Sequence, residues 1–279
     1  ASNPLELKRR RPAHPFGESG MIDIHCHPLT GVDDGARSFE VSVEMCKQAA
    51  ADGITHLVAT PHCNFEYPFK PEVNRTKLEE LQAAVGELPK LLLGCDFHLS
   101  YDNIRLLIEG YKCFTINGTD YLLVEFGDQF IPDQMDRVLY EMQCTSVQPI
   151  LTHPERNPVF QQHPDLLYHW VSRGCLVQVT AKSFTGGFGK RALRFSEMWF
   201  EQNLINFFAS DAHDPEHRPP VLSECYRKVK ESKGSEVADL LLKHNPQAVI
   251  EGRPLSPGLV PVDPKQAKKK RSWFSFFRR

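Results

Sequence analysis

Short apolar runs alternate with longer amphipathic stretches from Met21 to about Gly252. Phe39, Val43 and Cys46 recur at helical spacing and predict a helix over residues 38–51, whereas residues 55–60 read as a strand. The same reasoning predicts helices over 74–88, 133–143, 165–173 and 192–203, and strands over 21–24, 91–95, 121–126, 149–152, 176–180 and 205–209. Such alternation indicates a parallel α/β domain, most simply a barrel or a distorted barrel. Catalytic residues of such barrels lie at the carboxyl ends of the strands.

The charge distribution separates a globular body from two basic ends. Of the formal net charge of −2, residues 1–20 contribute a balance of +2 and residues 263–279 a balance of +6, which leaves −10 for the rest. We therefore expect a basic N-terminal extension over 1–20, a globular domain over 21–252, and a Pro-rich linker with a basic-aromatic tail over 253–279. The acidic body argues against a nucleic-acid track and suits bound cations.

The cysteines and the hydropathy predict a cytoplasmic protein. No apolar run reaches the roughly 20 residues of a membrane span, and no stretch of signal-peptide type opens the chain. The eight cysteines contain no CxxC pair, which favours reduced thiols, and none is followed six positions later by arginine, so a Cys-x5-Arg phosphatase site is absent. We expect four of them to be small packing residues: Cys26, Cys63, Cys95 and Cys113.

The last twelve residues combine basic side chains with four aromatics and no acid. Basic residues near an anionic membrane gain roughly 1 kcal/mol each, and aromatic rings suit the interface. The tail therefore predicts contact with the inner face of the membrane. There are two alternatives. The tail could only aid solubility, or it could dock on a neighbouring subunit of a homo-oligomer.

Histidines and carboxylates gather at the predicted strand ends. His25 and His27 follow the first apolar run, and residues at i and i+2 of a strand point the same way. Asp211 and His213 repeat this arrangement after the run 204–209. Imidazoles and carboxylates together are ligands of Zn, Mn and Fe ions. Two or three ions would be needed to use every candidate, because further ones follow other strands: Asp33, Asp34, His62, Asp96, Glu125 and His153.

Five ordered motifs resemble the PHP superfamily, and within it the bacterial capsular-polysaccharide protein-tyrosine phosphatases of the CpsB/YwqE type. The motifs are Met-Ile-Asp-Ile-His-Cys-His at 21–27, Asp-Asp-Gly-Ala at 33–36, Ala-Thr-Pro-His at 59–62, Leu-Thr-His-Pro-Glu-Arg-Asn at 151–157 and Ala-Ser-Asp-Ala-His at 209–213. The resemblance implies a distorted (β/α) barrel of the PHP type with a trinuclear metal site at the carboxyl ends of the strands. Manganese is the expected metal, with iron or zinc open. The implied substrate is phosphotyrosine on a bacterial tyrosine kinase that controls capsule or exopolysaccharide synthesis.

The resemblance also implies roles for single residues. His25 and His27 with Asp211 would hold the first metal, Asp96 would bridge, Glu125 and His153 would complete the second site, and Asp34, His62 and His213 would serve the third. Arg156 and Arg218 would hold the phosphate, although a salt bridge from Arg156 to Glu155 or another loop carboxylate is an alternative. Metal ions would activate a water that attacks phosphorus, and Asp34 and His62 are the candidates for protonating the leaving phenolate.

One departure from the family pattern keeps other functions open. The bridging carboxylate is typically Glu, whereas this chain has the shorter Asp96, which could instead be a surface residue. His98, two positions on, would line the pocket wall or serve a structural role, with contact to substrate as the alternative. The alternatives are a phosphoesterase of the same superfamily acting on a small molecule such as histidinol phosphate, or on nucleic-acid ends, and a metal-binding docking module without turnover.

Overall fold

The computed structural model describes residues 20–87 and 89–264. Nearly all of the predicted N-terminal extension and the tail beyond Pro264 lie outside the described residues. All strand pairings are parallel, in two sheets of order β1-β2-β4 and β3-β5-β6-β7-β8-β9. The strands are β1 (Met21–Cys26), β2 (Ile54–Ala59), β3 (His62–Cys63), β4 (Lys90–Leu93), β5 (Asp96–His98), β6 (Tyr121–Glu125), β7 (Gln148–Thr152), β8 (Leu176–Thr180) and β9 (Phe207–Ala209).

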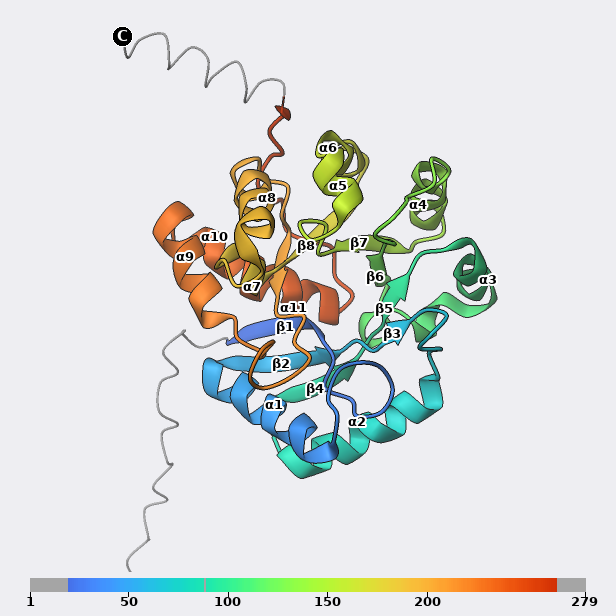
Figure 1. Ribbon diagram of the computed structural model, residues 1–279, viewed down its shortest axis with the longest axis vertical. Helices are drawn as coiled ribbons and strands as arrows, with labels where there is room; N and C mark the ends of the chain where they lie inside the picture. The colour runs from blue at the N-terminus through green and yellow to red at the C-terminus, as the bar shows by residue number, and fades with distance from the viewer. Residues whose placement is uncertain (1–19, 88, 265–279) are drawn as a thin grey trace, which may run out of the picture.

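Helices surround the strands on the outside, as Figure 1 shows. They are α1 (Phe39–Asp52), α2 (Pro71–Val85), α3 (Tyr101–Gly110), α4 (Met135–Cys144), α5 (Pro158–Gln162), α6 (Asp165–Val171), α7 (Ala181–Phe184), α8 (Gly189–Glu201), α9 (Ser223–Lys233), α10 (Ser235–Asp239) and α11 (Asn245–Ile250). Short 3-10 turns span Tyr111–Cys113 and Ile116–Gly118, and a π-helical turn spans Leu240–His244. No described helix is long and apolar enough to cross a membrane.

The two sheets together form a distorted, incompletely closed ring of parallel strands, in agreement with the predicted distorted barrel. At one junction the amide of Asp211 donates to the carbonyl of His25, and the amide of His27 donates to the carbonyl of Ala212, so the end of β9 meets β1. At the other junction β2 and β4 break off before β3 and β5 begin. The amide of Gly94 bonds to Ala59 there, and a Cβ at Gly94 would lie 3.1 Å from the Val58 side chain. The close approach of the chains explains why glycine stands at this position.

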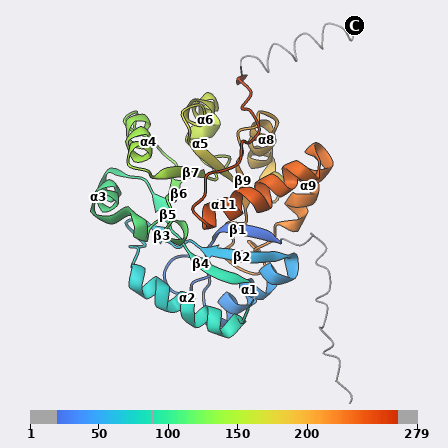
Figure 2. The same cartoon turned by 180° about the vertical axis from the view of Figure 1, so that it is seen from behind.

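The ring interior changes from apolar to polar toward the carboxyl ends of the strands. Leu123 and Ile150 pack in a buried apolar cluster that includes Val249 of α11, and α11 lies against β1 (Figure 2). Two residues further along the same strand faces stand Glu125 and Thr152. The interior is therefore filled on one side and opens as a polar site on the other.

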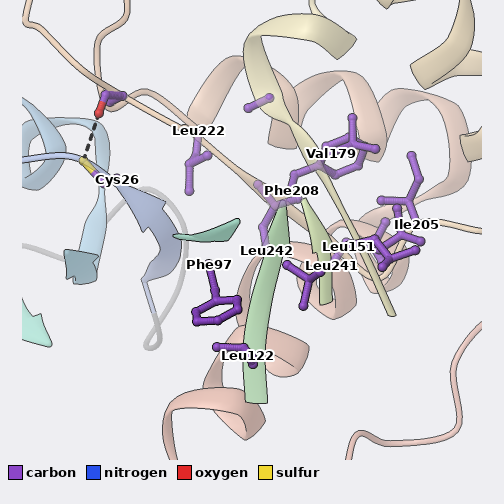
Figure 3. Packing of buried hydrophobic residues seen from close by; sticks show 14 of the residues in the cluster. Cys26, Phe97, Leu122, Leu151, Val179, Ile205, Phe208, Leu222, Leu241 and Leu242 are labelled. Carbon is purple, nitrogen blue, oxygen red and sulfur yellow. Dashed lines mark hydrogen bonds between the residues drawn. The ribbon is translucent and has the colours of Figure 1, made fainter. Parts of the chain in front are cut away.

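A second, larger core fills the layer between strands and helices. Leu122, Leu151, Val179 and Phe208 turn outward from their strands into this layer and are fully buried (Figure 3). All eight cysteines are free. Cys26, Cys63 and Cys95 are buried as predicted, but the prediction of a packing role for Cys113 is wrong, because its 3-10 turn lies at the surface.

Candidate metal centre

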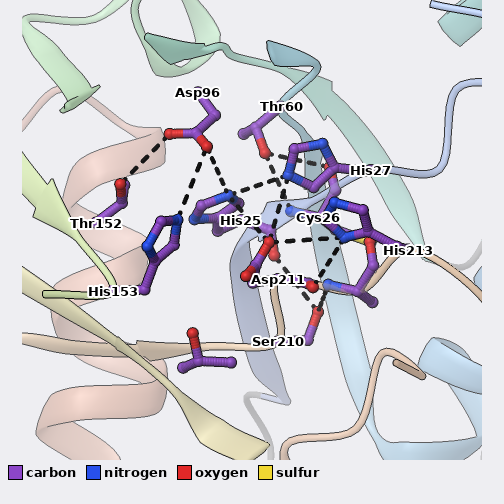
Figure 4. Close-up of polar contacts among 12 residues, drawn as sticks. His25, Cys26, His27, Thr60, Asp96, Thr152, His153, Ser210, Asp211 and His213 are labelled. Atoms are coloured by element: carbon purple, nitrogen blue, oxygen red, sulfur yellow. Dashed lines mark hydrogen bonds and ion pairs between the residues drawn. The ribbon is translucent and has the colours of Figure 1, made fainter. Parts of the chain in front are cut away.

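His25 and His27 point at one spot, as their spacing in the first strand predicts. Their Nε2 atoms lie 3.1 Å apart and both residues are fully buried. Asp211 Oδ1 lies 3.5 Å from each of these nitrogens, and Asp96 Oδ2 lies 3.5 Å from the His25 nitrogen. Figure 4 shows the four side chains converging from β1, β5 and the end of β9. This arrangement offers two imidazoles and two carboxylates to one centre.

A second group of ligand atoms lies on the other side of His27. His27, Asp34, His62 and His213 each place one nitrogen or oxygen within 4.8 Å of all the others. Asp34 Oδ1 lies 3.4 Å from His62 Nε2 and 3.5 Å from His213 Nε2. Asp34 is about half exposed, whereas the His213 side chain is 8% exposed. This group therefore lies at the solvent edge of the centre.

A third group joins the far nitrogen of His62 to the remaining candidates. His62 Nδ1 lies 3.2 Å from Asp96 Oδ2 and 3.7 Å from Glu125 Oε2. His153 Nε2 lies 3.7 Å from Glu125 and 3.9 Å from Asp96. Asp96 is fully buried, so the alternative of a surface residue is wrong. The structure thus brings all nine predicted ligands together in three overlapping groups, with His27, His62 and Asp96 each shared between two groups.

Side chains behind the histidines fix the direction of their rings. Gln178 Oε1 of β8 lies 3.0 Å from His25 Nδ1, and Asp33 Oδ2 lies 2.8 Å from His27 Nδ1. A partner on the outer nitrogen leaves the inner one to face a metal and raises its basicity. Asp33 stood among the sequence candidates, but Gln178 did not. The sequence feature that could have indicated Gln178 is its polar side chain within the apolar run Leu-Val-Gln-Val-Thr.

A buried carboxylate ties the first strand to the loop that carries Asp211. Asp23 accepts hydrogen bonds from the Ser210 amide at 3.0 Å and from the Ser210 hydroxyl at 2.5 Å. Burial raises the pKa of Asp23 to about 6, although these hydrogen bonds oppose the rise. Sequence analysis did not single out either residue, because the contact joins positions far apart in the chain.

Two of the candidate ligands have left-handed backbone conformations. His153 has φ of 33° and Asp211 has φ of 50°. For residues other than glycine such conformations cost on the order of 1–2 kcal/mol. Each follows the last residues of its strand, so the backbone reverses sharply there and turns the side chain back over the ring.

The electrostatics keep the two buried carboxylates ionised. Burial alone raises the pKa of Asp96, but His25, His153 and His62 together outweigh it and hold that pKa well below the usual range. At Asp211 burial is likewise overcome, here by the Arg156 guanidinium and His25. Burial lowers the pKa of His213 to about 4. At His25 the neighbouring Asp96 and Asp211 overcome the effect of burial and raise the pKa to about 9. Metal ions bind ionised carboxylates and neutral imidazoles, so binding at His25 releases a proton.

Two arginines border the same cleft. Arg156 Nη2 donates to Asp211 Oδ2, and Arg218 Nη2 donates to the same oxygen at 2.7 Å. Arg156 thus forms a salt bridge with a loop carboxylate, as the predicted alternative allowed, but its partner is Asp211 rather than Glu155. The Glu155 carboxylate instead accepts a hydrogen bond from the Thr180 amide at 3.1 Å. Phe188 lies beneath both guanidiniums, 4.9 Å from Arg156 and 5.6 Å from Arg218, and sequence analysis missed it.

The cleft above the ligands has a volume of about 250 Å³. Its wall includes Arg156 and Arg218, predicted to hold the phosphate, and Asp34 and His62, the candidates for protonating the leaving group. His98 lies behind Glu125, 3.7 Å from its carboxylate, rather than in this wall. The cleft therefore places cations opposite a set of metal-ligand atoms.

The residues fit bound divalent ions. His62 Nδ1 and Asp96 Oδ2 are buried and have no hydrogen-bond partner among the described residues. An unpaired buried polar atom costs about 1–3 kcal/mol, and both atoms point into the same gap between ligand groups. A cation at this position would satisfy them.

A family model decides where the chain belongs. The model for capsular polysaccharide synthesis, CpsB/CapC, matches residues 21–251. The chain belongs to the CpsB/CapC family. The match covers every predicted ligand and both arginines, and it ends within one residue of the globular domain predicted from the sequence.

Relatives within the CpsB/CapC family match over almost their whole length. Tyrosine-protein phosphatase YwqE of Bacillus subtilis is 33% identical over 260 residues, which is 92% of this chain and 100% of the relative. Tyrosine-protein phosphatase CpsB of Streptococcus agalactiae is 26% identical over 240 residues, 83% of this chain and 98% of the relative.

Solved structures give the same result for the fold. A crystal structure from a study of YwqE and of CpsB of Streptococcus pneumoniae, described as unique metal-dependent tyrosine phosphatases, superposes with a TM-score of 0.80 at 32% identity. It covers 87% of this chain and 98% of that one. The phosphotriesterase homology protein of Escherichia coli superposes with a TM-score of 0.54 at 10% identity over 83% of this chain and 99% of that one, a likeness of fold alone.

Proposed function

We propose that this chain is a metal-dependent protein-tyrosine phosphatase that hydrolyses phosphotyrosine. The observation that carries the proposal is the convergence of three metal-ligand groups with two guanidiniums on one cleft. Anionic phosphate needs cations around it, and a hydrolytic site needs an activated water. The similarity to metal-dependent tyrosine phosphatases supports the choice of phosphotyrosine.

The cofactors in this proposal are divalent metal ions, three in number, with manganese favoured over iron or zinc. His25, His27 and Asp211 would hold the first, with Asp96 as the bridge to the second. Glu125 and His153 complete that second site. When bound, the ions supply Lewis acidity and lower the pKa of a coordinated water. The shorter Asp96 reaches the ligand cluster because β5 runs beside β3 and β6, with Asp96 opposite His62 in the register.

The arginines position the substrate in this proposal. Arg156 and Arg218 can each offer two parallel hydrogen bonds to phosphate oxygens. The Phe188 ring limits their movement from below. Asp34 and His62 line the cleft at its open side, where the phenolate leaves, and stay the candidates for delivering a proton to it.

The partner we propose is a bacterial tyrosine kinase that controls capsule or exopolysaccharide synthesis. The description of the family model, capsular polysaccharide synthesis, supports this choice. A cytoplasmic location, with contact to the inner membrane face through the basic-aromatic tail, stays part of the proposal. The tail lies beyond the described residues, so it rests on the sequence alone.

The first test measures phosphate release from a tyrosine-phosphorylated peptide, with metal content determined on the same sample. His25→Ala with His27→Ala removes two buried ligands, and His163→Ala with His244→Ala removes two exposed histidines as the matched control. We expect manganese-dependent release by the wild type and the control, and loss of release and of bound metal in the ligand variant. Release that persists without metal would refute the proposal.

Two other outcomes separate the remaining alternatives. A full metal complement without release from the peptide would point to a small-molecule phosphate such as histidinol phosphate as substrate. Absence of both metal and release in the wild type would point to a docking module.

A further inference from the structure

A second and larger cleft lies between α5, α6 and α8. Its volume is about 750 Å³. The three helices are neighbours on the outside of the sheet in both views (Figures 1 and 2). Lys190, Arg191 and Arg194 line it, and Asp165 is the carboxylate among its lining residues. The cleft therefore has an excess of positive charge and lies outside the metal centre.

Its cations are available to a ligand. Lys190, Arg191 and Arg194 are exposed, and none has an ion pair within the part of the chain that the structure describes. Arg191 and Arg194 are three residues apart on α8, so their side chains project from one helix face. Two guanidiniums on one face can each offer a planar pair of donors, which matches a phosphate dianion better than a single carboxylate.

The same helix face continues as an apolar surface. Phe195 and Met198 stand four and seven residues after Arg191, at helical spacing, and both line the cleft while partly packed on the core. A ligand that fits must combine an apolar, flat body with a dianionic end. An O-phosphotyrosine side chain has this chemistry, because methionine and phenylalanine pack well against an aromatic ring.

Two segments of the chain connect the second cleft with the catalytic cleft. Asn157 and Phe160 at the start of α5 line the catalytic cleft, and Gln161 and Gln162 at its end line the second one. The turn before α8 runs from Phe188, beneath the phosphate-binding arginines, into the basic first turn of α8. The five residues of α5 rise about 7 Å along the helix axis. An extended substrate peptide covers this length in about two to three residues.

We propose that the substrate polypeptide carries two phosphotyrosines, and that the second cleft binds one of them while the other occupies the catalytic cleft. The inference rests on the proposed function, since it names a docking site for that function's substrate. It makes the enzyme selective for polypeptides that carry two phosphotyrosines a few residues apart. The second cleft has no part in the chemical step.

The C-terminal segment of the chain itself is the competing occupant. Pro264, the last described residue, lines the second cleft, and residues 265–279 follow it in the sequence. These residues carry seven Lys or Arg and no acid. Their charge repels the cations of the cleft, which argues for an anionic ligand from another molecule.

The test uses the full chain loaded with manganese and synthetic peptides that carry one phosphotyrosine or two. The two phosphotyrosines are placed about two, four or six residues apart, in line with the reach of an extended chain. Arg191→Ala with Arg194→Ala is compared with Arg227→Ala with Lys230→Ala, which removes the same charge from exposed positions of α9. Initial rates give KM and kcat for each peptide.

We expect the α8 variant to raise KM about tenfold for the best doubly phosphorylated peptide, with kcat unchanged, because charge-assisted hydrogen bonds are lost. Its KM for the singly phosphorylated peptide should equal that of the wild type and of the α9 variant. Equal KM values for both variants on every peptide would overturn the proposal.

Failure of the proposed function would look different, because the wild type would then release no phosphate from the singly phosphorylated peptide. Binding to vesicles that contain phosphatidylserine is measured in parallel. A loss of vesicle binding in the α8 variant with unchanged peptide kinetics would assign the cleft to a membrane and refute the inference.

Discussion

Gln178→Leu should weaken metal binding without unfolding the protein. Gln178 is fully buried, and its Oε1 lies 3.0 Å from His25 Nδ1. Its amide Nε2 is buried without a hydrogen-bond partner among the described residues. Leucine has a similar volume, so it leaves His25 Nδ1 unpaired but also removes an unpaired amide. Each effect is worth about 1–3 kcal/mol, and their opposite signs leave the free energy of unfolding nearly unchanged.

The loss should appear instead in metal affinity. Removing the partner of a metal-ligating histidine costs about 10- to 100-fold in affinity, or about 1.4–2.7 kcal/mol. Phosphate release would be measured against manganese concentration after treatment with a chelator. The variant curve should shift to higher manganese by that factor and approach the wild-type rate at saturation.

Gln148→Leu supplies the control. Gln148 begins β7 at the opposite edge of the sheet, and its amide donates to the Gly174 carbonyl at 2.8 Å. This variant loses one side-chain hydrogen bond but touches no ligand, so its manganese curve should match the wild type. A Gln178→Leu enzyme with wild-type manganese affinity and a reduced rate at saturation would refute the orienting role.

Variants at three further positions test other parts of the structure. Asp23→Ala strips the Ser210 amide and hydroxyl of their acceptor and should lower the free energy of unfolding by about 3 kcal/mol, measured by urea denaturation. Arg156→Ala should lower kcat/KM for a phosphotyrosine peptide about 10²- to 10³-fold, and Arg156→Lys should recover little because lysine lacks the planar fork; full activity of the lysine variant would contradict bidentate binding. Tyr226→Phe removes a 2.8 Å hydrogen bond to Asp239 and should cost about 1 kcal/mol below pH 10. Burial and that hydrogen bond raise the pKa of Tyr226 to about 12, so its contribution is present below pH 10 and is lost as the pH rises toward 12. The stability gap between wild type and variant should therefore narrow over that range, and a constant gap would show that the phenol does not act through its proton.

Much of the fold followed from hydrophobic period alone. The strand predicted over 176–180 is β8, and the helix predicted over 38–51 is α1 shifted by one residue. Ser38 accepts a hydrogen bond from the Val41 amide at the start of α1, and Gly53 ends it with φ of 97°. In these elements local chemistry and tertiary packing favour the same structure, so the hydrophobic pattern of the sequence was enough to predict them.

The prediction was wrong where tertiary contacts override the local pattern. The run 91–95 read as one strand, but the chain ends β4 at Leu93 and begins β5 at Asp96 in the other sheet. The break follows from close packing of Gly94 against β2, which no local pattern contains. Sequence analysis also missed α3 and the helices α9 to α11. In α9 the few apolar residues stand among many charged ones, which hides the helical period.

The candidate ligands were predictable because parallel strands bring their carboxyl ends to one edge. The i, i+2 spacing predicted that His25 and His27 lie side by side. The positions of the other candidate ligands at strand ends predicted that they lie near this pair. Their supporting residues were not predictable in this way. Phe188 lies in the segment Gly-Gly-Phe-Gly, and its contact with Arg156 joins residues 32 positions apart.

The left-handed conformation of His153 sets stability against activity in any directed evolution of this protein. Glycine at His153 would relieve about 1 kcal/mol of backbone strain, whereas glycine at Asp211 would also leave Arg156 and Arg218 without their buried partner. A screen that rewards heat resistance alone would therefore enrich inactive chains at the His153 codon. Mutant libraries intended to raise the thermal stability of the enzyme should keep the codons of His153 and Asp211 fixed. They should vary the outer helices instead, where no candidate metal ligand lies.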